Sequence, residues 1–358
     1  ECQLPQLDVS RNTALTALQC SGNALTELDV RSNAALVYLM CNRNQLTQLD
    51  VSQNAALAQL LCEENQLTEL DLSHNPAFRS LSCQQNQLTK LDVSQNLKLE
   101  YLHCAKNQLT TLDLSKNPYL KKLVCEGNQL TSLNVSQNPA LRKLDCYRNQ
   151  LTELDVSQNP ALKELNCYEN QLTELDLRQN PELQVLRCYE NQLTELDLSQ
   201  NPEMLQLRCC KNQLERLDVS RNIKLQEMNC SQNDLTSLDV SQMGDLEFLN
   251  CSNNRLAELD LRQSPKMIEL HCNDNFLESL DLSPDARPDK LYCDNNQLSS
   301  LNLEKEPTIF HASGNEYSIA IHWNRKTFDP SALPGNFDMS RAKDWTGVIE
   351  NGTDTLQV

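Results

Sequence analysis

The sequence is poor in several features that mark common classes of protein. Aromatic residues make up only 4% of the 358 residues, so a core must be built from Leu, Val and Cys rather than from large rings. No run of about 18 apolar residues could span a membrane, and the N-terminus lacks the basic and apolar regions of a signal peptide. We therefore expect a thin core and no membrane insertion.

Positive charge is also in deficit. The chain has 31 Lys and Arg against 49 Asp and Glu, which gives a net charge of −18. Nucleic acids and anionic membrane surfaces both require a clustered positive field on the protein. Neither is an expected partner.

Catalytic motifs are missing as well. The sequence contains no HExxH, no GxSxG and no P-loop, and its five histidines are scattered: His74, His103, His271, His311 and His322. His103 and His271 share one repeat position but lie eight repeats apart, so we expect both to be ordinary surface residues. The sequence predicts no enzyme activity, no cofactor and no metal site.

The sequence does contain a strict internal repeat. Fourteen cysteines, from Cys20 to Cys293, follow one another at an unbroken interval of 21 residues. The surrounding residues are nearly constant and give the pattern LxCxxNQLTxLDVSQNPxLxx, which is typical of leucine-rich repeats. The predicted fold is a curved, right-handed leucine-rich-repeat solenoid of about 15 coils.

Alternation within the repeat predicts which side chains face inward. In the LxC segment Leu144 and Cys146 face inward and Tyr147 faces outward, so this segment is expected to form a short parallel strand on the concave side. The LDV segment alternates in the same way around Asp155 and is expected to form a second extended run on the convex side. A single coil buries its apolar residues only when coils stack on both sides.

Three repeated polar or thiol columns have structural interpretations. The Asn149 column is expected to satisfy backbone groups at a turn. The Asp column, which includes Asp29 and Asp155, is expected to cap turns rather than bind calcium, because Asn134 replaces Asp without breaking the pattern. The ladder cysteines are expected to be buried, reduced thiols that pack as small apolar groups, since parallel strands hold them too far apart for disulfides.

Cys2 and Cys210 lie outside this cysteine ladder. Cys210 occupies the outward position beside Cys209, so it is the cysteine that we expect to be the most reactive. A chance substitution at a variable surface position explains it more simply than a thiol that forms intermolecular disulfides.

The composition changes after Asn315. Both tryptophans, Trp323 and Trp345, lie in the tail, and we divide the chain into a solenoid at 1–315 and a cap or the start of a further β-rich module at 316–358. Tyr317, Ile319, Ile321 and Trp323 are expected to close the apolar end of the solenoid.

Over residues 1–315 the chain resembles bacterial leucine-rich-repeat surface proteins of the cysteine-ladder internalin type, because a Cys at 21-residue spacing replaces the usual strand Leu. The resemblance implies a secreted or surface-exposed adhesin that binds a protein or glycan of a host cell or matrix. Fourteen free thiols are better protected in a reducing cytosol, which makes a cytoplasmic location the alternative, although burial of the thiols weakens this objection to secretion.

The positions that vary from repeat to repeat predict the binding face. Tyr147, Tyr168 and Tyr189 follow the ladder cysteine in three consecutive repeats, and tyrosine is favoured at interfaces. An alternative is that these rings only stabilise the sheet through cross-strand pairing. The expected mixed-charge rim comprises Asp145, Arg148, Asn166, Glu169, Arg187, Glu190, Arg208 and Lys211.

The functional hypothesis is a monomeric, non-catalytic scaffold that binds a macromolecule on its concave face. Two alternatives stay open. The chain is the recognition arm of a larger effector enzyme, or it is an intracellular inhibitor or scaffold. Fold alone does not choose among them.

Overall fold

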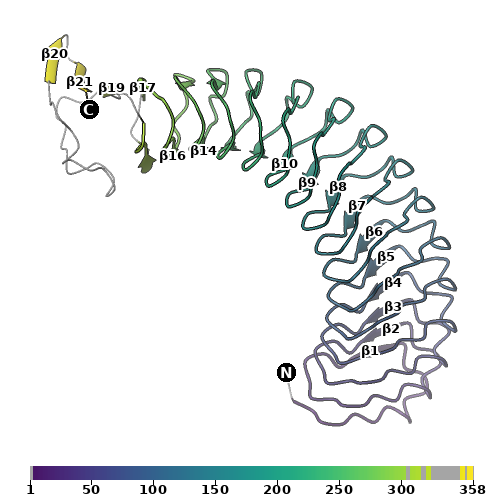
Figure 1. Cartoon of the computed structure of the whole chain (residues 1–358). Coiled ribbons are helices and arrows are strands. Elements are labelled where there is room, and N and C mark those ends of the chain that lie inside the picture. The colour runs from purple at the N-terminus through teal and green to yellow at the C-terminus, as the bar shows by residue number, and fades with distance from the viewer. Residues whose placement is uncertain (1–2, 304–306, 316–319, 324–346, 351–352, 358) are drawn as a thin grey trace. The chain divides into compact units, whose positions relative to one another are not determined.

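A computed structural model describes residues 3–303, 307–315, 320–323, 347–350 and 353–357. The chain divides into two compact units, 1–183 and 184–358. Each 21-residue repeat forms one coil of a parallel β-solenoid, as the sequence predicted (Figure 1). Among the described residues there is no helix that could cross a membrane.

The first unit contains one strand per coil, and each strand has three residues. They are β1 (Ala17–Gln19), β2 (Tyr38–Met40), β3 (Gln59–Leu61), β4 (Ser80–Ser82), β5 (Tyr101–His103), β6 (Lys122–Val124), β7 (Lys143–Asp145) and β8 (Glu164–Asn166). Consecutive strands pair in parallel, with each residue opposite its equivalent 21 positions on, as Leu144 opposite Leu165. These strands line the inner side of the unit's curve (Figure 1).

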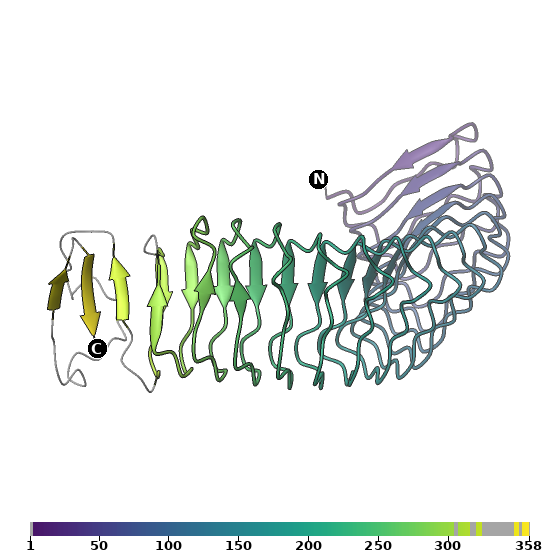
Figure 2. The ribbon, with the colours of Figure 1, turned by 90° about the horizontal axis from the view of Figure 1, so that it is seen from above.

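The second unit continues the same pattern of strands. Its first sheet comprises β9 (Val185–Arg187), β10 (Gln206–Arg208), β11 (Glu227–Asn229), β12 (Phe248–Asn250), β14 (Glu269–His271), β16 (Lys290–Tyr292) and β18 (Ile309–His311). Figure 2 shows that these strands lie side by side, one from each coil.

The LDV segments form strands only near the end of the chain. There β13 (Asp260–Leu261) pairs with β15 (Asp281–Leu282), and β17 (Ser300–Asn302) pairs in parallel with β19 (Ala320–Trp323). The expected second extended run is therefore a regular sheet in a few coils only. β19 also pairs with β21 (Thr353–Gln357), which pairs with β20 (Gly347–Glu350). Ile321 and Trp323 lie in β19, whereas Tyr317 and Ile319 lie outside the described residues.

The interior of each coil is built from the residues that the repeat pattern assigned to it. Leu144, Cys146, Leu151 and Leu162 are fully buried, and Leu154 is 6% exposed. Packing is this uniform because each coil presents the same shape to its neighbours on both sides.

The chain leaves each strand through a residue in the left-handed backbone region. Two positions after the ladder cysteine, Arg43, Glu64 and Arg148 have φ of 54°, 55° and 54°. Glycine occupies this position at Gly127, with φ of 64°. L-residues rarely adopt this conformation, so the turn imposes strain that the rest of the coil must offset.

Candidate functional site

The cysteine ladder forms part of the core, and it does not form a reactive site. All fourteen ladder cysteines are buried free thiols, which confirms their predicted burial. Burial raises the pKa of Cys104 and Cys251 to about 12. A thiol with so high a pKa is protonated at neutral pH and is a poor nucleophile or metal ligand.

The Asn149 column satisfies backbone groups between adjacent coils, as predicted. Asn149 Nδ2 donates to the carbonyl oxygens of Cys125 and Cys146, each at 3.1 Å. Its Oδ1 accepts a hydrogen bond from the backbone N–H of Leu130 at 3.0 Å. These bonds tie each turn to the preceding coil.

A second asparagine column has a similar role that the sequence analysis missed. Asn159 Nδ2 donates to the carbonyl oxygens of Val135 at 3.0 Å and Asn138 at 2.9 Å, and its side chain is fully buried. The signal was present in the sequence, because Asn recurs every 21 residues from Asn12 to Asn222. Both columns are structural.

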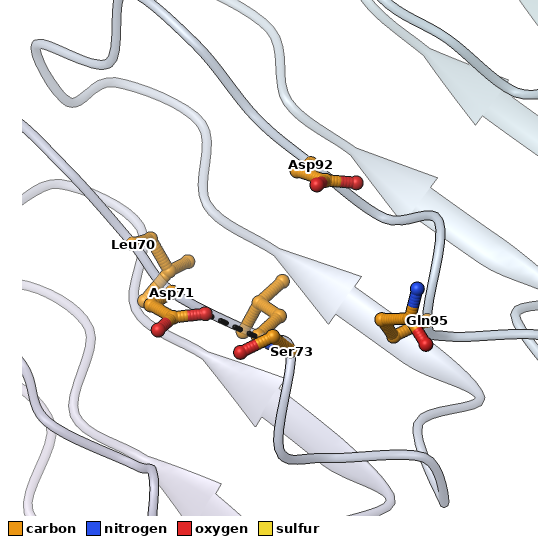
Figure 3. A pocket seen from close by; sticks show the side chains of 6 residues that line it. Leu70, Asp71, Ser73, Asp92 and Gln95 are labelled. Carbon is orange, nitrogen blue, oxygen red and sulfur yellow. Dashed lines mark hydrogen bonds between the residues drawn. The ribbon is translucent and has the colours of Figure 1, made fainter.

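The Asp column caps turns on the side of the coil away from the strands. Asp71 Oδ1 accepts a hydrogen bond from the backbone N–H of Ser73 at 2.9 Å, and this contact lowers the pKa of Asp71 (Figure 3). Asn134 caps Ser136 in the same way at 3.0 Å. The predicted capping is therefore confirmed.

A small pocket lies beside this column, with a volume of about 70 Å³. Asp71, Asp92 and Gln95 line it from two neighbouring coils (Figure 3). This volume holds a few water molecules, far below the several hundred Å³ of an ordinary ligand pocket. Within the described ranges, no three His, Cys, Asp or Glu side chains are placed to share a metal ion.

The first unit brings two of the three predicted tyrosines together. The rings of Tyr147 and Tyr168 stack with their centroids 4.1 Å apart and their planes 12° from parallel. Both side chains are half-buried, and burial raises the pKa of Tyr147. Tyrosine combines an apolar ring with a polar hydroxyl group, which suits both polar and apolar contacts with a partner.

The surroundings of this stack differ from the expected exposed rim. Asp145 is only 8% exposed and accepts a hydrogen bond from Asn166, so neither belongs to an open rim. The prediction that Asp145 and Asn166 belong to the rim was wrong because neighbouring outward side chains cover one another. Arg148 is exposed and forms a 2.8 Å ion pair with Glu169.

A buried carboxylate lies next to the stack in the same column. Glu126 is 7% exposed, and its Oε2 has no hydrogen-bond partner among the described residues. Burial raises the pKa of Glu126. The sequence analysis did not single out this residue.

The second unit carries the remaining predicted residues on its own strand face. Tyr189 is half-buried at the repeat position of Tyr147. Lys211 and Glu190 form a 2.6 Å ion pair, and Arg208 lies 3.7 Å from Glu227. Arg187 donates a hydrogen bond to Gln206 at 3.0 Å.

Cys210, also in this unit, is half-buried, and burial raises its pKa. The thiolate is therefore disfavoured, which supports a chance substitution over a reactive thiol. Cys2 lies outside the described residues.

A further aromatic cluster in the second unit was missed. His271 and Tyr292 stack with ring centroids 4.3 Å apart, and Tyr292 and His311 stack at 4.9 Å. His271 also lies 2.7 Å from the Glu269 carboxylate. His271 is thus not an ordinary surface residue, and the signal was three aromatic rings at one position in consecutive repeats.

His103 also departs from its expected role. It is half-buried, and burial, helped by Lys122 and Lys106, lowers its pKa to about 4. The imidazole is therefore neutral at pH 7.

Comparison with known proteins connects this architecture to known leucine-rich-repeat structures. No protein-family model and no curated protein matches the chain. The functional domain of InlJ from Listeria monocytogenes, which includes a cysteine ladder, is 36% identical with a TM-score of 0.74, and the match covers 82% of this chain and 75% of that one.

Two further structures are less similar in sequence. A leucine-rich-repeat protein of Leptospira interrogans is 26% identical with a TM-score of 0.64, covering 75% of this chain and 80% of that one. YopM from Yersinia enterocolitica is 26% identical with a TM-score of 0.61, covering 85% and 75%. These neighbours support a scaffold for protein interaction. The chain belongs to the leucine-rich-repeat proteins of the cysteine-ladder internalin type.

Proposed function

We propose that this protein is a secreted or cell-surface adhesion module that binds a macromolecule of a host cell or matrix through its strand face. Membership of the internalin type supports this location and role. The inward positions of the coils are nearly invariant, whereas the outward strand positions vary from repeat to repeat. Variation restricted to one face is what a recognition surface on a constant scaffold requires.

The Tyr147–Tyr168 stack is the observation that carries the proposal for the first unit. The rings lie on the outside of the sheet and contribute nothing to the buried interior of the coils. Tyrosine offers a large contact area and a hydroxyl group at small cost in rotamer entropy. In the second unit, Tyr189 with Arg187, Arg208 and the Glu190–Lys211 pair forms a separate candidate surface of the same type.

The test compares the wild-type chain with a Tyr147→Ser/Tyr168→Ser variant for binding to host-cell surfaces, matrix proteins and mucin-type glycans. The proposal predicts binding by the wild type and a loss of about tenfold or more in the variant, with an unchanged melting curve. Tyr119→Ser is the matched control, because Tyr119 is 61% exposed but lies outside the strands. Equal binding by all three proteins contradicts the proposal.

The same variants separate binding from sheet stabilisation. A clear fall in the melting temperature of the double variant supports the alternative in which the two rings only pair across strands. Binding to a glycan but to no protein would identify the partner as carbohydrate.

A second candidate is the recognition arm of an effector. YopM from Yersinia pestis, described as a leucine-rich effector protein, is 25% identical to this chain with a TM-score of 0.68. The buried free thiols also suit a reducing compartment. The adjoining coding sequence discriminates between the two, since an export signal with a wall anchor favours the adhesin and a catalytic domain favours the effector.

A further inference from the structure

The strand face of the first unit carries a second exposed surface, well before the tyrosine stack. Tyr38 on β2 and Tyr101 on β5 are 47% and 46% exposed, among the most exposed large apolar side chains described. Met40 and Leu61 lie beside them, and both are half-buried. With His103, these residues form what we call the β2–β6 patch.

Strand register fixes how the patch is arranged. Met40 lies directly opposite Leu61, and Tyr38 lies opposite Gln59. Ser80 lies opposite Tyr101, so two shorter side chains, Gln59 and Ser80, separate the tyrosines. Three strand spacings place the tyrosine backbones roughly 14 Å apart, which is wide enough for one polypeptide segment or one helix between them.

His103 extends the patch without adding charge. It shares β5 with Tyr101, and its neighbours in register are Ser82 and Val124. Because burial and the two nearby lysines lower its pKa to about 4, the ring is neutral at physiological pH. It therefore offers an uncharged aromatic surface.

Charged groups of both signs border the patch, but the carboxylates nearest to it are covered or paired: Glu63, directly after Cys62, is half-buried, and Glu100 is paired with two cations. Lys106 and Lys122 are exposed, and within the described part of the chain neither forms an ion pair. Lys121 and Arg79, in contrast, share the Glu100 carboxylate at 2.5 and 2.7 Å. Two available ammonium groups beside an apolar surface are unusual in a chain with a net charge of −18.

The next strands show where the surface ends. On β7 and β8 the equivalent outward residues are Lys143 and Glu164, which form a 2.7 Å ion pair. Their charges are neutralised within the protein, so these two positions offer neither an apolar side chain nor an unpaired cation. The patch is therefore confined to β2–β6 and is separate from the Tyr147–Tyr168 stack.

We propose that the β2–β6 patch is a docking surface for a protein segment that carries a large apolar side chain flanked by carboxylates. The apolar side chain packs between Tyr38 and Tyr101 against Met40 and Leu61, and the carboxylates face Lys106 and Lys122. Apolar contact supplies most of the affinity, and the lysines orient the segment and speed its association. The inference rests on the proposed function and names the partner chemistry for one part of the strand face.

The experiment selects ligands from a phage-displayed library of random 12-residue peptides against the full chain, and titrates the selected peptides by fluorescence anisotropy. Peptides that combine a Phe, Trp or Leu with Asp or Glu are expected to dominate. Tyr38→Ser/Tyr101→Ser should weaken their binding at least about tenfold. Lys106→Glu/Lys122→Glu should weaken it by a similar factor and remove its dependence on salt.

Two matched controls accompany these variants. Tyr119→Ser and Lys98→Glu replace exposed residues outside the strands and should leave the affinity unchanged. The lysine variant alters only exposed side chains, so it remains informative even if the tyrosine variant fails to fold, which a melting curve detects.

Each other outcome overturns the inference. Selection of basic peptides, or of peptides insensitive to both patch variants, contradicts it. Peptides that bind but depend on Tyr147 and Tyr168 instead overturn the β2–β6 patch and leave the proposed function standing. If no peptide binds and the wild-type chain also fails to bind host surfaces, both proposals fail.

Discussion

Inside each coil of the first unit the same residue types recur at the same places, whereas the outward side of its strands changes from coil to coil. The ladder position is Cys in all the coils from β3 to β7, while the next residue is Glu63, Gln84, Ala105, Glu126 or Tyr147. An inward residue contacts its own copies in the coils above and below, so a change affects three coils. An outward residue lies outside this interior, whether it is open, as Tyr38 is, or covered by its neighbours, as Glu126 is, and its identity is free to vary. Stability and recognition therefore occupy opposite sides of one strand.

The largest effect should follow from removing an inward asparagine. Asn149→Ala removes hydrogen bonds to three carbonyl groups and one N–H group, most of them buried. We expect a loss of about 3–5 kcal/mol in the free energy of unfolding, measured by urea titration with circular dichroism. Gln150→Ala, at the neighbouring exposed position, should have almost no effect. A loss below about 1 kcal/mol for Asn149→Ala would contradict the structural role of the column.

A smaller loss should follow from changing the chemistry of one ladder thiol. Cys146→Ser keeps the size of the side chain and buries a hydroxyl group in an apolar site. We expect a loss of about 1–3 kcal/mol. Cys210→Ser, at the half-buried outward position beside the ladder, should cost less. Equal losses at the two positions would argue against the distinction between the two sides of the strand.

Stability should change when glycine is removed from, or introduced at, the left-handed position of the turn after the strand. Gly127→Ala places a Cβ in the left-handed backbone region, 3.3 Å from Lys106 Cγ, and should cost about 1 kcal/mol. Glu64→Gly makes the opposite change at the equivalent position and should be neutral or stabilising. Differential scanning calorimetry would show both shifts, and a stabilising Gly127→Ala would refute the account of strain.

The smallest effect concerns the buried carboxylate beside the tyrosine stack. Because burial raises the pKa of Glu126, its folded form favours the proton, and stability is lost as pH rises from the ordinary value of 4.5 through the raised folded pKa. Glu126→Gln should raise stability at pH 7 by about 1 kcal/mol and flatten this part of the pH profile. Urea midpoints at several pH values provide the measurement. A variant less stable than wild type at pH 7 would show that the contacts of this carboxylate with Tyr147 and Lys106 outweigh the cost of its burial.

The interior of the coil could be predicted from sequence because periodicity determines it. The inward positions, the first asparagine column and the capping by Asp155 all follow from alternation and from turn chemistry. The second asparagine column is equally regular in the sequence, but a polar residue next to Pro or Ala in a turn segment looks like an exposed turn residue, so its burial does not follow from the pattern.

The outward surface was less predictable because the exposure of an outward side chain depends on whether neighbouring side chains lie over it. Asp145 points outward but is covered, whereas Tyr38 and Tyr101 remain open. The stack of His271 on Tyr292 depends on ring orientation, which spacing alone does not determine. The left-handed turn was hidden because most repeats place a residue other than glycine there.

The central claim is that the inward side of each strand supplies stability and the outward side is free for recognition. The most direct test is the unfolding free energy of a variant with four outward changes: Tyr38→Ser, Met40→Ser, Leu61→Ser and Tyr101→Ser. Urea titration should show a combined loss smaller than that of Asn149→Ala alone, because none of the four side chains belongs to the buried interior. A combined loss equal to or greater than that of the single inward change would contradict the claim that the strand face is free for recognition.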